Sequence, residues 1–188
     1  MIKKTLTMSI VVFLNLVLLS GCIEQSNNNS DNMITLDKLC LKLDDLYEEG
    51  YIKLNEIHKT SPYNASEGVF KGWLILEKYE LLFQKNQSSF IIQDLGRLSS
   101  EEKAVEFIDI LETADLPYNY TEVISETIGD KSYLGENITN ISGLKVQVYF
   151  LAFKIKNIVV ALAGSFLTKD TIIDYAKIIE NNIIENVT

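Results

Sequence analysis

The sequence predicts an α+β domain in which an antiparallel β-sheet is layered with two main amphipathic helices. Two observations carry this prediction. Residues 144–153 and 158–163 are apolar segments of strand length, separated by the turn-forming pair Lys156-Asn157. Two other segments, starting near residues 99 and 168, carry apolar side chains at i, i+3, i+4 and i+7, the spacing of one helix face.

The first residues have the parts of an export signal: Lys3 and Lys4, then a mostly apolar run over 6–19. The run is short for a membrane span, which needs about 20 apolar residues. It ends in Leu-Ser-Gly-Cys22, which resembles the lipobox of prokaryotic lipoproteins. The resemblance implies a lipid on Cys22 and cleavage before it, so that residues 1–21 are a signal peptide. An uncleaved signal anchor is the alternative.

Residues 22–33 follow as the lipidated cysteine and a flexible tether. Residues 23–32 have almost no apolar content and cannot offset the entropy of ordering. About ten flexible residues reach roughly 17 Å, which keeps the following domain near the membrane. Residues 34–188 then have a length that suits one domain.

The segment 34–60 allows two interpretations. Leucines at 36, 39, 43 and 46 have helical spacing, whereas those at 39, 41 and 43 alternate as in a strand. We favour a strand, a turn at Gly50 and a second strand through Ile52 and Leu54, and helix or strand stays open for residues 34–48. Residues 61–68 contain Pro62 and Gly68 and are expected to form a loop.

In residues 79–83 apolar side chains alternate with other residues, and residues 90–95 begin with an apolar run. Asn86-Gln87-Ser88 between them can form a turn, so the pair predicts a β-hairpin. Ser99 and Glu102 have the spacing of a capping box, so a helix is expected to begin there. Its apolar face consists of Ala104, Phe107, Ile108 and Leu111.

The C-terminal half continues with a weak strand over 123–128 that closes at a turn, Gly129-Asp130, in which Asp130 is expected to bond local backbone amides. Residues 158–163 are fully apolar and suit the centre of the sheet. Thr168 can cap the last helix. In the strand 144–153 one face is formed by Val146, Val148, Phe150 and Ala152, and in the last helix the inward face is Ile172, Tyr175, Ala176, Ile179 and Ile183.

A Gly-Asp turn, two apolar strands joined by Lys-Asn and a closing helix resemble the second half of PsbP-like extracytoplasmic domains. The sensor domains of mycobacterial membrane kinases share that outline. Residues 45–51, Asp-Leu-Tyr-Glu-Glu-Gly-Tyr, resemble the Asp-Leu-Pro-x-Gly-Tyr motif of many such proteins, with Tyr47 in place of proline and one extra residue. The resemblance implies a fold and a compartment, not an activity.

Charge and cysteine content exclude several classes of function. The net charge is −9, Arg97 is the only arginine, and without Lys3 and Lys4 the remainder stands near −11. An acidic chain with no basic cluster is unsuited to binding nucleic acid or anionic lipid head groups. With Cys22 lipidated, Cys40 has no partner for an intrachain disulfide, and its apolar neighbours indicate an inert core thiol.

Asparagine sequons are more frequent than composition predicts. Seven sequons occur. The chain has 15 Asn and 25 Ser or Thr among its 188 residues, and a random order of these residues would give about two sequons. N-glycosylation requires each to lie in an exposed loop or turn, and together with a lipobox it would fit an archaeal cell surface better than a bacterial one. Clustering of polar residues in turns is the alternative. The sequons begin at Asn28, Asn64, Asn86, Asn119, Asn137, Asn140 and Asn186.

No catalytic residues, cofactor site or metal site are predicted. His58 is the only histidine, and neither Ser61 nor Cys40 stands in the context of a nucleophile, so His58 is interpreted as an ordinary exposed residue beside a loop. With one histidine and one free cysteine, zinc is not expected. Trp73 is expected to fill the core. The densest acidic group lacks the order of a calcium loop and is interpreted as a solvated turn; it comprises Asp44, Asp45, Glu48 and Glu49.

These observations favour a non-catalytic binding or accessory domain of a membrane complex, held by the lipid on Cys22 to the outer face of the cytoplasmic membrane. Its partners would be the membrane and, as a further expectation, a membrane protein. Two alternatives stay open: a hydrolase built from carboxylates on the exposed face of the sheet, and a structural component of the envelope.

Overall fold

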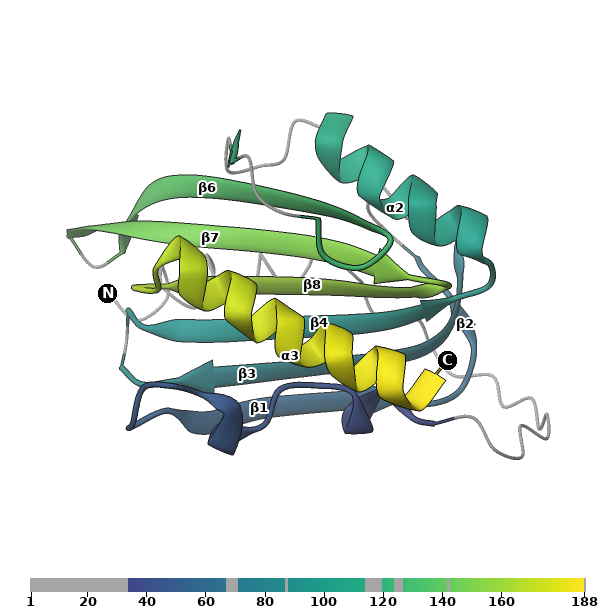
Figure 1. Cartoon of the computed structure of the whole chain (residues 1–188), viewed down its shortest axis with the longest axis horizontal. Coiled ribbons are helices and arrows are strands. Elements are labelled where there is room, and N and C mark those ends of the chain that lie inside the picture. Colours follow the sequence, from purple (N-terminus) through teal and green to yellow (C-terminus); the bar gives the residue numbers. More distant parts are fainter. Residues whose placement is uncertain are drawn as a thin grey trace.

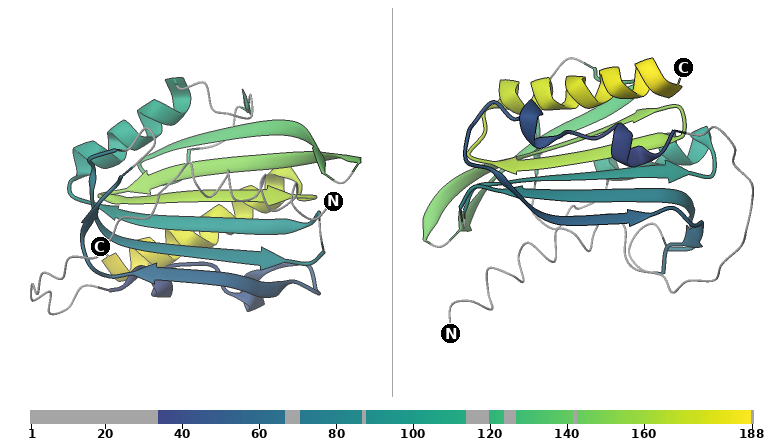
Figure 2. Two further views of the ribbon diagram at one scale, coloured as in Figure 1. Left: turned by 180° about the vertical axis from the view of Figure 1, so that it is seen from behind. Right: turned by 90° about the horizontal axis from the view of Figure 1, so that it is seen from below.

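The computed structural model describes residues 34–66, 71–86, 88–113, 120–123, 127–141 and 143–187. They form an eight-stranded antiparallel sheet of order β1-β3-β4-β8-β7-β6-β5, with β2 paired to β3. Helix α3 crosses one face of the sheet, and α2 covers one corner of the opposite face (Figures 1 and 2). The predicted α+β architecture with two helices on an antiparallel sheet is confirmed.

The elements have the following bounds. The 3-10 helices are η1 Leu36–Lys38 and η2 Leu43–Asp45, and the α-helices are α2 Glu101–Thr113 and α3 Lys169–Val187. The strands are β1 Ile52–Lys59, β2 Tyr63–Asn64, β3 Leu74–Gln84, β4 Phe90–Leu98, β5 Thr121–Glu122, β6 Lys131–Ile141, β7 Leu144–Ile155 and β8 Ile158–Ser165.

Strand β8 lies at the centre of the sheet, as its continuous apolar sequence predicts. Every one of its residues is buried, which requires cover on both faces. Ile158, Val160 and Leu162 face α3, whereas the smaller Val159, Ala161 and Ala163 face α2. These small side chains allow α2 to approach the sheet closely.

Helix α3 begins as predicted at Thr168, whose Oγ1 accepts a hydrogen bond from the Thr171 amide at 3.1 Å. All five residues of the predicted inward face are buried. Among the described residues, no helix is both long and apolar enough to cross a bilayer.

Helix α2 has the predicted apolar face, and all four of its residues are buried. Its cap is one residue later than predicted. The Ser100 side chain, not that of Ser99, accepts a bond from the Lys103 amide at 3.3 Å, because the helix begins at Glu101. With Ser100 as the cap, the third residue of the helix is Lys103 and not Glu102, so the predicted capping box is wrong.

The favoured strand before Gly50 is wrong: residues 34–46 contain the two 3-10 helices and lie across the α3 face of the sheet. Leu36, Leu39 and Leu41 are fully buried, whereas Leu43, the last leucine of the predicted alternation, is exposed. The backbone bonds go to side chains instead of a neighbouring strand. The Leu41 amide donates to Gln93 Oε1 at 2.9 Å, and Gln93 Nε2 donates back to the Leu41 carbonyl at 3.3 Å. The second predicted strand, through Ile52 and Leu54, is confirmed as β1.

The region around Gly129-Asp130 differs from the prediction. β5 precedes the expected strand 123–128, of which residues 124–126 lie outside the described residues. Asp130 bonds a distant amide, that of Lys156 at 2.8 Å, and not a local one. Gly129 has φ +64°, and a Cβ there would lie 2.4 Å from the Lys154 carbonyl oxygen, so this turn requires glycine. The long strand β6 follows, which the sequence did not indicate.

The packing of α3 gives a first prediction. Ile179 is fully buried against the sheet. Ile179→Ala should lower the free energy of unfolding by about 2–4 kcal/mol, because it removes buried methyl groups and leaves a cavity. Asp174→Ala, on the exposed side of the same helix, should stay within about 0.5 kcal/mol. Urea denaturation measures both, and equal losses would contradict this packing.

Candidate binding site

Four polar side chains gather on the face of the sheet opposite α3. Lys78 and Glu80 lie on β3, Asp94 lies on β4, and Tyr63 lies on β2, which pairs with β3. Glu80 and Asp94 are directly opposite one another in the β3–β4 register. Two facing carboxylates repel each other, so a sheet tolerates this pair only with a compensating group.

The compensating group is the Lys78 ammonium. Its Nζ lies 2.8 Å from Glu80 Oε2 and 3.6 Å from Asp94 Oδ2. The three side chains are buried, with residue exposures of 3% for Lys78, 2% for Glu80 and 6% for Asp94. We refer to these residues with Tyr63 as the sheet-face cluster.

The environment shifts two pKa values. Burial raises the pKa of Asp94 to about 7; Lys78 counteracts this and Glu80 adds to it. Burial also raises the pKa of Tyr63, and the charges of Asp94 and Glu80 raise it further, so its hydroxyl stays neutral. The cluster therefore holds one carboxyl group that exchanges a proton near neutral pH.

Within the residues that the structure describes, four buried side-chain oxygens lack a hydrogen-bond partner, and three belong to this cluster: Tyr63 Oη, Glu80 Oε1 and Asp94 Oδ1. Buried polar atoms are rarely left unpaired, since each costs roughly 1–3 kcal/mol. Three at one location indicate a place where an added molecule can supply the missing partners.

An apolar cluster adjoins these groups on the same face. Leu82 and Ile92 follow the polar residues along β3 and β4 and face one another in the register. They pack with Phe90 and with two residues of β7. Polar anchors beside an apolar floor are the usual composition of a small-molecule site. The apolar cluster consists of Leu82, Phe90, Ile92, Val146 and Val148.

The geometry favours binding over carboxylate catalysis. In glycoside hydrolases a water or a sugar lies between two carboxyl groups. Here the Lys78 ammonium is within reach of both Glu80 and Asp94, so it holds that position. The two carboxyl oxygens without partners, Glu80 Oε1 and Asp94 Oδ1, can accept hydrogen bonds from hydroxyl groups or a protonated amine on a ligand.

His58 is exposed, as predicted, and is the next-to-last residue of β1. The prediction missed its acid partner: His58 Nε2 is 2.9 Å from Glu77 Oε1. Cys40 is buried as predicted, and burial raises the pKa of its thiol. Its Sγ donates to the Asp37 carbonyl at 3.0 Å. Whether His58 and Cys40 are dispensable stays a prediction.

The remaining candidates have structural contacts. The acidic group from Asp44 to Glu49 forms the predicted solvated turn, in which Glu48 pairs with Lys85 at 3.2 Å. Trp73 is only partly buried against the core under α2, and Lys103 Nζ lies 4.6 Å from the centre of its ring.

The predicted modification sites are distributed differently from expectation. Cys22, with the predicted signal peptide and tether, lies outside the described residues, as do Asn28 and Asn119. Of the described sequons only Asn86 lies in a turn, where its Oδ1 accepts the amides of Ser88 and Ser89. Asn64, Asn137 and Asn140 are in strands and Asn186 is in α3, contrary to the expected loops.

Sequence reasoning missed the sheet-face cluster, although a signal for it exists. Lys78 and Glu80 alternate with Tyr79 and Leu81, so one face of the strand is charged while the other is apolar. Asp94 interrupts an apolar run in the same way. β3 and β4 each have a neighbouring strand on both sides, so they are inner strands of the sheet. Charged side chains on an inner strand indicate a polar site, because burial of a charge is costly unless a partner compensates it.

Asp94 provides a prediction on pH. The native state holds its proton at pH values where the unfolded chain has lost it, so raising the pH from 4 toward 7 should lower the free energy of unfolding. The slope from one such group is at most about 1.4 kcal/mol per pH unit. Asp94→Asn should remove this component and increase stability at pH 8, whereas the exposed Asp44→Asn should not. Urea denaturation between pH 5 and 8 measures it, and parallel curves for wild type and Asp94→Asn would contradict it.

No family model and no curated protein sequence matches this chain. Among solved structures, the chain is similar to the extracellular domain of PknH from Mycobacterium tuberculosis, with a TM-score of 0.51 and 8% sequence identity. The match covers 84% of this chain and 100% of that one. At this identity the likeness concerns the fold alone, and it agrees with the predicted α+β outline.

Proposed function

We propose that this chain is a lipid-anchored extracytoplasmic binding domain whose ligand site is the sheet-face cluster. The observation that carries the binding role is the group of three buried oxygens without partners on Tyr63, Glu80 and Asp94. A ligand with hydroxyl groups or a protonated amine would donate to the two carboxylates, and its apolar part would lie toward Leu82 and Ile92.

The proposed location rests on the N-terminal sequence. A charged start, an apolar run and Leu-Ser-Gly-Cys22 have the order of a lipoprotein signal. Two acyl chains on one cysteine provide the stable anchoring that a single chain does not. The structurally similar PknH domain is extracellular, which is consistent with a domain outside the cytoplasm. An accessory role in a membrane complex, and an archaeal surface with glycosylated asparagines, belong to the same proposal.

The anchor is tested by Cys22→Ser. Because the thiol receives the lipid before cleavage, the variant should accumulate as an uncleaved precursor without lipid. Detergent phase partition and mass spectrometry of the N-terminus measure this, with Cys40→Ala as the control that keeps the anchor. Normal processing at residue 22 in Cys22→Ser would end the lipoprotein proposal.

The binding role is tested by native mass spectrometry of the full chain, extracted with mild detergent from the membranes in which it is made. The wild type should carry an additional small molecule, and the double variant Glu80→Gln, Asp94→Asn should lose it at least about tenfold. Asp44→Asn with Glu49→Gln removes the same charge from an exposed turn and should retain the adduct. An adduct present equally in all three proteins, or in none, would contradict this site.

A further inference from the structure

A second group of side chains lies on the other face of the sheet, at its β1 edge. Asp37 of η1, His58 of β1 and Glu77 of β3 each place one ligand atom within 4.8 Å of the other two. His58 is opposite Tyr79 in the β1–β3 register, and Tyr79 belongs to the core under α3, so this group faces away from the sheet-face cluster. It is therefore a separate site.

We infer that Asp37, His58 and Glu77 form a binding site for a divalent metal ion of the zinc class. An imidazole nitrogen with two carboxylate oxygens is a mixed N and O donor set, which suits zinc better than magnesium or calcium. Bonds of about 2.0–2.2 Å place the ligand atoms of a tetrahedral ion roughly 3.3–3.6 Å apart. The present atoms bracket that spacing, because all lie within 4.8 Å of one another and His58 Nε2 is 2.9 Å from Glu77 Oε1.

The Asp37 carboxylate supports this inference independently. Its Oδ1 is buried and is the fourth described buried oxygen without a hydrogen-bond partner. The rest of Asp37 is well fixed, because η1 is bound to the sheet through the Leu36 amide, which donates to Glu77 Oε1 at 2.8 Å. A metal ion beside His58 would supply the partner that Asp37 Oδ1 lacks.

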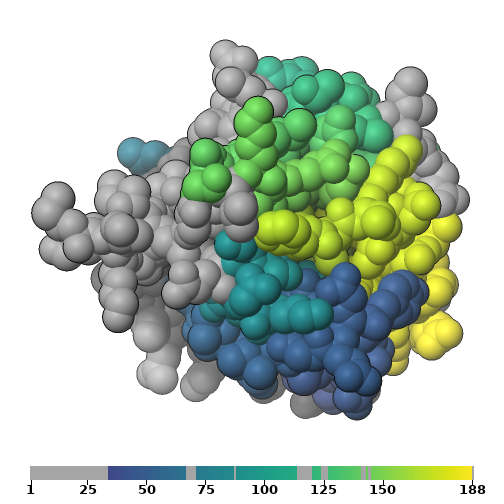
Figure 3. All heavy atoms as spheres, turned by 90° about the vertical axis from the view of Figure 1, so that its left-hand side faces the viewer, coloured from purple at the N-terminus to yellow at the C-terminus, as the bar shows by residue number. Residues whose placement is uncertain are grey.

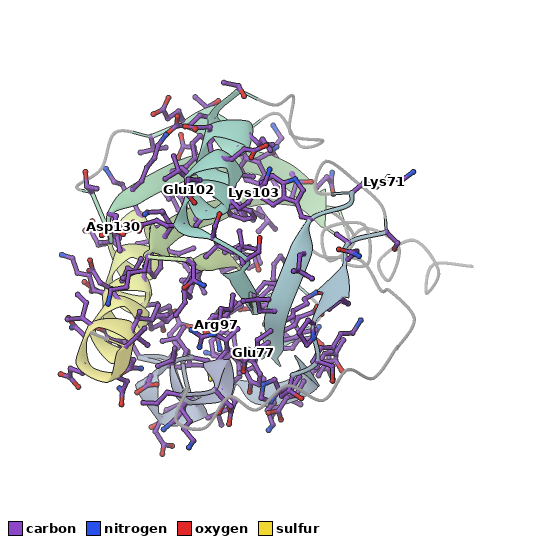
Figure 4. The ribbon with its side chains drawn as sticks, turned by 90° about the vertical axis from the view of Figure 1, so that its right-hand side faces the viewer. Lys71, Glu77, Arg97, Glu102, Lys103 and Asp130 are labelled. Atoms are coloured by element: carbon purple, nitrogen blue, oxygen red, sulfur yellow. The ribbon has the colours of Figure 1, made fainter. Side chains whose placement is uncertain are left out.

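The groups around Glu77 hold it in place as a ligand. Arg97 Nε lies 3.4 Å from Glu77 Oε2, and the Leu36 amide bonds Oε1, so the carboxylate is oriented by neighbours that do not themselves bind metal (Figure 4). Such outer contacts commonly fix the ligands of metal sites. Two acidic side chains, Asp37 and Glu77, here outnumber the one basic side chain that contacts them, Arg97, and this composition favours a bound cation.

The His58 imidazole would exchange its bond to Glu77 for a bond to the ion. Its Nε2 lies 2.9 Å from Glu77 Oε1, and an ion between the two atoms would replace their hydrogen bond. The His58 side chain is 27% exposed, so the ion can enter from solvent. Three protein ligands leave a coordination position for water or for a group on a partner.

The experiment uses the fact that His58 is the only histidine of the chain. The full chain, purified without a histidine tag, is titrated with zinc chloride while the single imidazole is followed by 15N-edited NMR. Its signals should shift and saturate at one zinc per chain, and EDTA should reverse the shift. Unchanged imidazole signals in about a tenfold excess of zinc would overturn the proposal.

Variants locate the site. By isothermal titration, Asp37→Asn should weaken zinc binding at least about tenfold, and His58→Gln should weaken it further. Asp44→Asn, also an acid in a short 3-10 helix, should bind as the wild type does. Both site variants keep side-chain size, and far-UV circular dichroism confirms their folding. Zinc binding unchanged in His58→Gln would assign the ion to surface acids and refute this site, while leaving the proposed ligand site unaffected.

Discussion

The burial of β8 on both faces is the constraint on which the rest of the fold depends. A strand without a solvent-exposed side requires a layer above and below it. Helix α3 provides one layer with Ile172, Ile179 and Ile183, and α2 provides the other over the small residues of β7 and β8. The packing of α3 and α2 on the two faces of β7 and β8 supplies the core. The more distant strands β3 and β4 can therefore carry polar side chains.

Polar side chains occur where the helical layers end. On the α3 face, Gln93 and Glu77 of the sheet bond the backbone of residues 34–46, which covers the region that the helix does not reach. On the other face, Lys78, Glu80 and Asp94 neutralise one another only in part and leave oxygens without partners. Both proposed sites therefore lie over β3 and its neighbours, on opposite faces, and a ligand at one does not compete with an ion at the other.

The sequence predicted the elements whose periodicity reflects burial, namely both helices, the β3–β4 hairpin and the β7–β8 pair. It failed for residues 34–46, because the buried leucines resemble a strand while the backbone bonds reach a side chain 52 residues away. β6 was missed because Gly135, Asn137 and Asn140 have low strand propensity, although β7 pairs with all eleven of its residues. Neither site was predicted, since each combines residues from three separate elements that only the folded arrangement brings together.

The attachment of residues 34–46 has a mechanical consequence. Arg97 Nη2 donates to the Ile34 carbonyl at 2.8 Å, so the first described residue is tied to the sheet by one side chain, and the next bonds are those of Glu77 and Gln93. Seen from the end of the sheet in Figure 3, this part of the chain lies on the surface against α3. A pulling force applied through residues before 34 would act on these bonds and on the buried leucines one after another, as in peeling, and not on a strand ladder in shear. The segment would detach under a smaller load than the sheet, which would separate Asp37 from His58 while the remaining strands stay folded.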